Sequence, residues 1–273
     1  MKKVIFIDVD GTLKNDNNEI TPRTLKAIQE VKSIGYEPIL CTGRPRDYAE
    51  KLNSSIGGSR YIIYNNGGGI FDCQENKVIY ENGMNNKSIS ELYELANLKD
   101  IRFILACDGT RYVNRLKHHD GSEILIEKTL NEFLKDHKVI QVTITSSNYE
   151  LLKDMKHKIE DVSDVRIMNQ HKSLIDLNFE KIGTIYYDIV DDKTSKGDAV
   201  SYFCQLFDIS KENRIAIGDD NNDISMFNEC GYRVAMKNAL ISLKELSDYI
   251  TNDNNNDGVA EYLEKIIKES KNA

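Results

Sequence analysis

The first hydrophobic segment of the chain is a short unbroken run, without the apolar and polar alternation of a half-exposed strand. Positions Val4 to Ile7 are all apolar and β-branched or aromatic. This pattern predicts a strand buried between two layers of helices. Thr21 and Pro22 then have the residue types preferred at a helix cap and first helical position, and we predict a helix from there to about Gly35.

Strand-like and helix-like segments alternate at both ends of the chain. Further strands are predicted at 36–41, at 60–64 before a glycine-rich turn, and at 214–220, 232–236 and 248–251. Further helices are predicted from about 46 and at 196–207, 223–230, 239–246 and 259–267. Strands and helices in turn predict an α/β fold, with a parallel sheet covered on both faces.

The middle of the chain has a different pattern, with more strands in succession. Strands are predicted at 101–107, 139–146, 164–170, 173–179 and 184–190, and helices near 88–97, 123–136 and 148–161. We interpret this region as an α+β domain, residues 84–185, inserted into an α/β core made of residues 1–83 and 186–273. No proline- or serine-rich linker marks its edges.

Composition narrows the possible partners. The net charge is −8, with acidic and basic residues interspersed, whereas a nucleic-acid-binding protein would usually show a basic face. No apolar run approaches the length of a membrane span or a signal peptide. The five cysteines are scattered without C-x-x-C spacing, which indicates a reduced, cytoplasmic protein with no disulfide framework or zinc site. The charge of an anionic substrate would have to be met locally, by a metal or a few side chains.

Two carboxylates stand one residue apart at the end of the first predicted strand. Asp8 and Asp10 are followed by Gly11, which permits a sharp exit from the strand. In open α/β sheets the carboxyl ends of the strands face the ligand crevice. Two carboxylates there would repel each other unless a positive group came between them. The alternative is that both are turn and capping residues, since Asp-Gly is a common turn signal.

Other polar residues follow the other predicted strands or begin the next helices. They are Thr42, Gly43, Lys196, Asp219, Asp220, Asn222 and Asp223. A hydroxyl, exposed backbone N–H groups and an ammonium at a helix start are suited to phosphate oxygens. Each of them alone could be a helix cap or a solvated surface charge. Together, at the strand ends of one parallel sheet, they indicate a functional site.

Four short motifs carry a family resemblance. The segments "DVDGTL", "CTGR", "SKGDAV" and "GDDNND" occur in this order. With them the chain resembles the haloacid dehalogenase superfamily, and within it the Cof-type phosphatases with a large inserted cap. The resemblance implies a Rossmann-like core with an inserted cap of the C2 type. It further implies a phosphatase that acts on small phosphorylated metabolites such as sugar phosphates.

The resemblance also implies roles for individual residues. Asp8 would attack phosphorus to form an aspartyl-phosphate. Asp10 would be the general acid and base, with a pKa raised relative to that of Asp8. Mg²⁺ would be bound by Asp8, the Asp10 carbonyl and Asp219, with Asp223 close by or bridged by water. The phosphoryl group would be held by Thr42, the Gly43 N–H, Lys196 and Asn222.

Two other functions share part of this machinery. A phosphomutase or phosphotransferase of the same fold differs only in what accepts the phosphoryl group, and the sequence does not separate it from a phosphatase. A phosphoacceptor signalling domain also uses a strand-end aspartate, but it needs neither Asp10 nor a cap. No oligomeric state can be assigned.

Substrate discrimination would have to come from the inserted domain, because the core motifs address only phosphate and metal. Within it, Asn114, Arg115, Lys117 and His118 are concentrated in one segment that could meet sugar hydroxyls. The alternative is an exposed charged loop, since polar loops are common.

Overall fold

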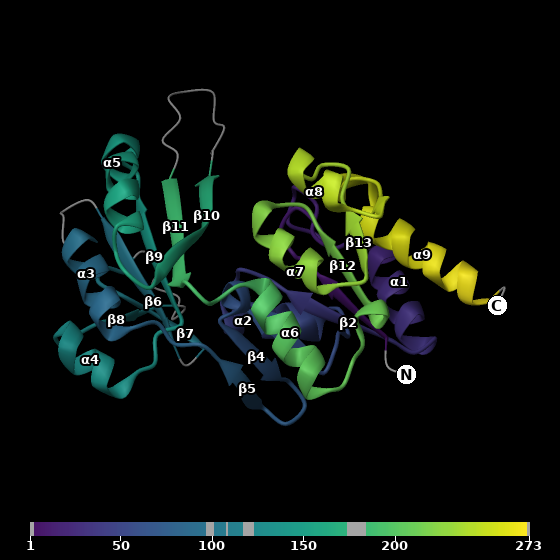
Figure 1. Ribbon diagram of the computed structural model, residues 1–273, viewed down its shortest axis with the longest axis horizontal. Helices are drawn as coiled ribbons and strands as arrows, with labels where there is room; N and C mark the ends of the chain where they lie inside the picture. Colours follow the sequence, from purple (N-terminus) through teal and green to yellow (C-terminus); the bar gives the residue numbers. More distant parts are fainter. Residues whose placement is uncertain (1–2, 97–100, 108, 117–122, 174–183, 272–273) are drawn as a thin grey trace. The chain divides into compact units, whose positions relative to one another are not determined.

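The computed structural model describes residues 3–96, 101–107, 109–116, 123–173 and 184–271. The chain forms two compact units. Residues Met1–Tyr80 and Ser195–Ala273 make up the first, and Glu81–Thr194 the second (Figure 1). The boundary expected at residue 185 falls inside strand β11 (Thr184–Asp191), whereas the whole of this strand belongs to the second unit.

The first unit is built on one eight-stranded sheet. In spatial order its strands are β14 (Tyr249–Ile250), β13 (Tyr232–Ala235), β12 (Arg214–Gly218), β1 (Lys3–Ile7), β2 (Tyr36–Cys41), β3 (Tyr61–Tyr64), β4 (Gly69–Asp72) and β5 (Lys77–Glu81). Neighbouring strands from β14 to β3 are parallel, and β4 is antiparallel to β3. The predicted α/β fold with a parallel sheet is confirmed.

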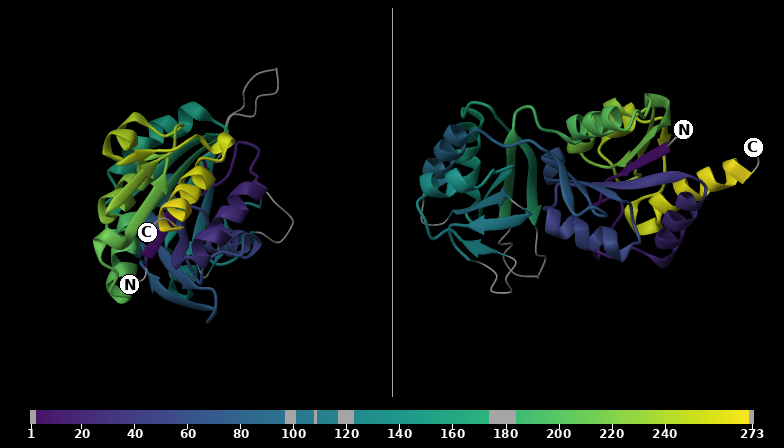
Figure 2. Two further views of the ribbon diagram at one scale, coloured as in Figure 1. Left: turned by 90° about the vertical axis from the view of Figure 1, so that its right-hand side faces the viewer. Right: turned by 90° about the horizontal axis from the view of Figure 1, so that it is seen from below.

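Helices cover both faces of this sheet. They are α1 (Pro22–Ser33), α2 (Arg46–Ser55), α6 (Lys196–Leu206), α7 (Ile224–Glu229), α8 (Ile241–Leu246) and α9 (Gly258–Lys271). Helices α1 and α9 pack together on one face, and α6 and α7 pack together on the other (Figure 2). Helix α1 begins as predicted, because the Thr21 hydroxyl accepts a hydrogen bond from the Thr24 N–H and Pro22 occupies the first helical position.

The chain changes direction across the sheet at β1. From β1 it proceeds to β2 and β3 on one side, and it later returns to β12 and β13 on the other. The carboxyl ends of β1, β2 and β12 therefore meet where the strand order reverses, which is the usual ligand site of open α/β sheets. The polar residues that the sequence places after these strands lie at that edge.

Strands β4 and β5 are missing from the sequence-based prediction, which ended this part of the chain in a glycine-rich turn. The turn is a 3₁₀ segment, Asn65–Gly67, in which Asn65, Asn66 and Gly67 all have positive φ. Three consecutive residues in this region turn the chain back on itself, so β4 pairs antiparallel with β3. Hydrophobic pattern alone does not reveal such a reversal.

The second unit has a six-stranded sheet with helices packed against it. In spatial order its strands are β10 (Val165–Ser173), β11, β9 (Gln141–Ser146), β6 (Arg102–Cys107), β7 (Thr110–Val113) and β8 (Ile124–Leu125). Its helices are α3 (Asn86–Ala96), α4 (Leu130–Asp136) and α5 (Tyr149–Glu160). The strand predicted at 173–179 lies almost entirely outside the described residues.

The helix predicted at 123–136 is wrong in its first half. Residues Ile124–Leu125 pair with β7 as a short strand, and helix α4 begins only after Thr129. Thr129 and Glu132 form a capping box, in which each side chain bonds the other residue's backbone N–H. This T-x-x-E signature marks a helix start that the prediction overlooked.

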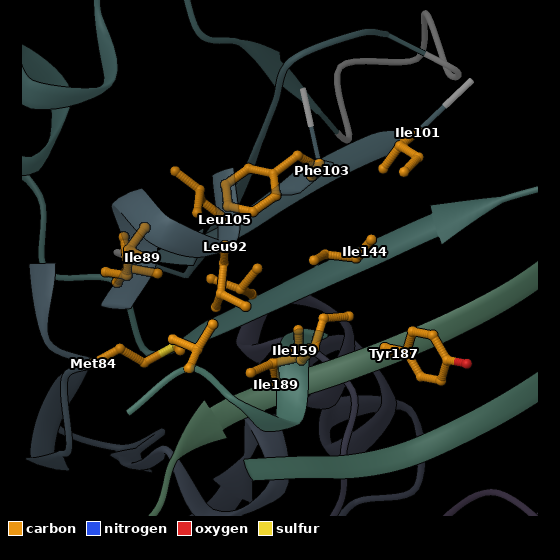
Figure 3. Packing of buried hydrophobic residues seen from close by; sticks show 14 of the residues in the cluster. Met84, Ile89, Leu92, Ile101, Phe103, Leu105, Ile144, Ile159, Tyr187 and Ile189 are labelled. Carbon is orange, nitrogen blue, oxygen red and sulfur yellow. The ribbon is translucent and has the colours of Figure 1, made fainter. Parts of the chain in front are cut away.

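A hydrophobic core holds the second unit together (Figure 3). Leu92 of α3 is fully buried, as are Phe103 of β6 and Ile144 of β9. These side chains come from elements far apart in the sequence, so the core joins the helices to the sheet. Among the described helices, none is both long and apolar enough to cross a membrane.

Replacing Leu92 by Ala should destabilise the protein by about 2–5 kcal/mol, because it removes buried methyl groups and leaves a cavity. Glu94→Ala on the exposed face of the same helix is the matched control and should change stability little. Urea denaturation followed by circular dichroism measures both. Equal stability of the two variants would show that α3 is not part of the core.

Candidate active site

The side chain of Asp8 extends from the end of β1 into a buried ion pair. The Asp8 N–H still donates to the Ile217 carbonyl at 3.0 Å, so the residue continues the pairing with β12. The Lys196 ammonium donates to Asp8 Oδ1 at 2.5 Å and to Asp223 Oδ1 at 2.7 Å. Lys196 is completely buried and Asp8 is only 6% exposed. A buried ammonium is tolerated because both carboxylates pair with it.

Lys196 is positioned by the cap of helix α6 and by the residue before that cap. The Ser195 hydroxyl accepts from the backbone N–H of Asp198, which fixes the start of the helix. Thr194 precedes it and is fully buried. Its hydroxyl accepts from Asn82 at 2.6 Å, and its carbonyl accepts from the Arg166 guanidinium. Asn82, Arg166 and Thr194 all belong to the second unit, so these contacts lie within that unit.

Asp223 is oriented by the turn that follows β12. Its Oδ2 accepts from the N–H groups of Asp219 and Asp220, at 2.9 and 3.1 Å, while its Oδ1 accepts from Lys196. One carboxylate oxygen from each of Asp8, Asp219 and Asp223 lies within 4.8 Å of the other two. Three carboxylates and one ammonium leave this cluster with a net charge of −2.

The side chain of Asp219 is oriented by the loop that follows β1. Thr12 Oγ1 donates to Asp219 Oδ1 at 2.7 Å, so Thr12 orients an acidic residue. Gly11 has a φ of +80°, and a Cβ there would lie 2.3 Å from Asp219 Oδ2. Only glycine permits both this backbone conformation and this close approach. The sequence predicted the sharp turn at Gly11 but not its contact with Asp219.

The charge of the cluster shifts the pKa values of its members. Burial raises the pKa of Asp8 well above its ordinary value; the Lys196 ammonium opposes this effect, and the carboxylates of Asp223 and Asp219 add to it. Burial and the Asp223 carboxylate raise the pKa of Asp219 to about 7. Burial alone would lower the pKa of Lys196, but Asp223 and Asp8 raise it above its ordinary value. The one ammonium of the cluster thus does not balance its three carboxylates.

Asp10 lies in a different environment from Asp8. Burial favours its neutral form, but Arg44 Nε and Nη2 donate to its two oxygens at 2.8 and 2.7 Å and keep its pKa below the ordinary value. The resemblance implied a pKa of Asp10 raised relative to that of Asp8. This order is wrong for the site as it stands, because the pairing with Arg44 was not foreseen.

The remaining predicted residues are brought together through Asn66. Thr42 continues β2, its N–H donating to the Ile63 carbonyl and its hydroxyl accepting from the Arg44 N–H. A Cβ on Gly43 would lie 2.9 Å from Asn66 Oδ1, and this oxygen accepts from Asn222 Nδ2 at 3.0 Å. No role was assigned to Asn66 from sequence, although it lies in the "NNGG" segment after β3.

The polar segment of the inserted domain is partly engaged within its own unit. Asn114 Oδ1 accepts from the Phe103 N–H at 2.9 Å, and the Arg115 guanidinium contacts the Ile101 carbonyl at 3.4 Å. Lys117 and His118 lie outside the described residues. The contact of this segment with sugar hydroxyls stays a prediction. Asn114 also has a structural role, because its side chain binds the backbone of β6.

The acidic cluster fits a divalent cation. Asp8 and Asp219 offer carboxylate oxygens, the ligand type that hard cations prefer, and a charge of +2 would balance the cluster. Both oxygens of Asp223 accept hydrogen bonds of 2.7–3.1 Å, whereas Asp219 Oδ2 has only a 3.5 Å contact with Asn238, so Asp223 is better suited to an outer position.

Comparison with known proteins assigns the family. A family model described as haloacid dehalogenase-like hydrolase matches residues 5–263. The chain belongs to this family. The family resemblance predicted from the four sequence motifs is therefore confirmed, and with it the fold class.

Several relatives extend over almost the whole chain. A 5-amino-6-(5-phospho-D-ribitylamino)uracil phosphatase of Bacillus subtilis, YcsE, is 27% identical and covers 96% of this chain and 94% of its own. A phosphoglycolate phosphatase of Methanobrevibacter smithii is 28% identical, with coverage of 96% and 97%. The crystal structure of TM0651 from Thermotoga maritima superimposes with a TM-score of 0.80 at 25% identity and covers 97% of each chain.

Replacing Asp219 by Asn should stabilise the protein at pH 8 in the presence of a chelator, because one of three crowded charges is removed. The folded-state pKa of about 7 exceeds the ordinary value of 3.8, so stability from this group is present below about pH 4 and lost as the pH rises through 7. We expect a Tm about 2–4 °C above wild type at pH 8, the shift produced by about 1 kcal/mol, and a smaller difference at pH 5.5.

A divalent cation should reverse this order, raising the Tm of the wild type more at pH 8 than at pH 5.5 and that of D219N little. Asp192→Asn, at an exposed position, is the matched control and should respond to the cation as wild type does. Scanning calorimetry measures all three proteins. An equal response of D219N and wild type would remove Asp219 from the cation site.

Proposed function

We propose that this hydrolase is a Mg²⁺-dependent phosphatase of small phosphorylated metabolites that works through an aspartyl-phosphate intermediate. One observation carries the proposal. A strand-end carboxylate, Asp8, contacts a buried lysine and an acidic cluster, and a second carboxylate, Asp10, follows two residues later. The phosphatase names of relatives that match nearly the whole chain support the same class.

The first half-reaction transfers the phosphoryl group to Asp8. A carboxylate oxygen of Asp8 attacks phosphorus, the bond from phosphorus to the alcohol oxygen breaks, and Asp10 gives a proton to that oxygen. The Arg44 pair keeps Asp10 ionised in the free site. A doubly charged phosphoryl group beside Asp10 raises its pKa again, since like charges favour the neutral form. Substrate binding would thus help to load the proton that Asp10 donates.

The second half-reaction releases phosphate. Asp10, now ionised, removes a proton from water, and the water oxygen attacks phosphorus and breaks its bond to Asp8. The Arg44 contacts favour this ionised form. In both steps the phosphoryl oxygens would be bound by Thr42, the Gly43 N–H, Lys196 and Asn222.

Mg²⁺ would be held by Asp8, the Asp10 carbonyl and Asp219, with Asp223 close by or bridged by water. When bound, the ion would supply positive charge that offsets the negative charge of the phosphoryl oxygens and of Asp8. The choice of magnesium rests on the oxygen donors, which hard cations prefer.

We do not assign the substrate of any relative to this chain. Two relatives of similar identity are named for different phosphate esters, one a ribityl phosphate and the other phosphoglycolate. We assign phosphate chemistry to the first unit, and discrimination among esters to the second unit as a cap. A cytoplasmic location without nucleic-acid or membrane partners is part of the proposal and rests on the charge and the five free cysteines.

Asp8→Asn should abolish Mg²⁺-dependent release of phosphate from p-nitrophenyl phosphate, because the amide cannot act as the nucleophile. Wild type quenched in acid during turnover should carry a phosphoryl group that hydroxylamine removes, and D8N should carry none. Activity of D8N above a few per cent would exclude Asp8. Transfer of the phosphoryl group to a second sugar phosphate, without free phosphate, would identify a phosphomutase instead.

Asp10→Asn should slow phosphoenzyme formation from an alkyl phosphate by roughly 10²-fold or more, because a poor leaving group needs its proton. Formation from p-nitrophenyl phosphate should fall much less, because nitrophenolate leaves without one. Rapid-quench measurements of both substrates separate this step from phosphoenzyme breakdown. An equal fall in the rate of phosphoenzyme formation from both substrates would show that Asp10 acts in binding or folding and not as the acid.

A further inference from the structure

Lys14 is a charged residue that the proposed chemistry does not use, and it lies beside Asp10. After the turn at Gly11 the chain folds back, so that Asp10 and Lys14 form an isolated β-bridge. The Lys14 N–H also donates to the Val9 carbonyl at 2.9 Å. The loop geometry therefore holds Lys14 next to the residue that must face the leaving oxygen.

Tyr48 of helix α2 joins Lys14 to Arg44. The Lys14 ammonium donates to Tyr48 Oη at 2.5 Å and lies 5.1 Å from the centre of its ring. The Arg44 guanidinium carbon lies 5.2 Å from the same ring. One aromatic side chain thus contacts two cations, an arrangement stabilised by cation–π attraction.

The charges of this group do not balance. Arg44 is matched by Asp10 through two hydrogen bonds. Within the described residues, no carboxylate oxygen lies within 4.0 Å of the Lys14 ammonium, and its hydrogen bond goes to a neutral hydroxyl. Among Arg44, Lys14 and Asp10, two cations therefore face one carboxylate, and the charge of Lys14 also acts on Asp10. The buried cluster at Asp8, by contrast, is negative and would be balanced by its metal.

We propose that Lys14 and Tyr48 bind a second anionic group of the substrate, a carboxylate or another phosphate on the alcohol portion. The inference rests on the proposed function, because it places the leaving oxygen at Asp10. An anion a few bonds beyond that oxygen would reach the Lys14 ammonium. The Tyr48 hydroxyl accepts from Lys14 and can give its own hydrogen to the same anion.

The alternative is that Lys14 only packs against Tyr48 and supports the loop. A supporting residue would affect every substrate alike, whereas an anion-binding residue changes the preference between substrates. The decisive quantity is therefore the ratio of kcat/KM for two matched esters that differ only in the second charge.

The experiment compares phosphoglycolate with 2-hydroxyethyl phosphate, and 1,3-propanediol bisphosphate with 3-hydroxypropyl phosphate. We expect wild type to favour the anionic member of at least one pair, and K14M to reduce that ratio about 10-fold, as expected for loss of one charge-assisted hydrogen bond. Added salt should reduce the ratio in wild type. The pair that responds identifies the anion as carboxylate or phosphate.

Two controls accompany the variant. Lys26→Met makes the same change at an exposed lysine of helix α1 and should keep the wild-type ratio. Lys14→Arg keeps the charge and should restore most of the preference that K14M loses. Thermal unfolding of each variant shows that it folds.

Three results would overturn the inference. They are equal kcat/KM of wild type for both members of both pairs, a parallel loss for both members in K14M, or no change in the K14M ratio. These results differ from failure of the proposed function, in which wild type would release no phosphate from any of the four esters with Mg²⁺.

Discussion

The site depends on one buried ammonium held between two carboxylates. Lys196 is completely buried, and its hydrogen bonds to Asp8 and Asp223 join the start of α6, the end of β1 and the turn after β12. An unpaired ammonium at this depth would be strongly unfavourable. The pairing can therefore form only when all three segments are in place.

The same interaction determines the electrostatics of the site. One ammonium cannot balance Asp8, Asp219 and Asp223, so burial and mutual repulsion raise the pKa values of Asp8 and Asp219. Around Asp10 the balance is opposite, since Arg44 lowers its pKa. Two aspartates one residue apart on one strand end thus have different acidities, because burial dominates at Asp8 and the pairing with Arg44 dominates at Asp10.

Much of the fold and of the site could be predicted from local signals. The buried run Val4 to Ile7, the Thr21 cap and the polar residues after each strand all follow from short-range rules. The reversal at Asn65–Gly67 and the late start of α4 after Thr129 were missed, the first because positive φ at Asn is a property of the folded turn. The pairing of Arg44 with Asp10 joins residues from two different loops and has no local signature.

The sequence by itself determined the family, the parallel sheet and the residue types at each strand end, because hydrophobic periodicity and motif spacing are properties of neighbouring positions. Tertiary structure alone decided which of these residues touch. Lys196 meets Asp8 across 188 positions, and Asn222 meets Asn66 across 156. The acidities of Asp8 and Asp10 depend on such contacts, because a pKa responds to burial and to charges a few ångströms away rather than to neighbours along the chain.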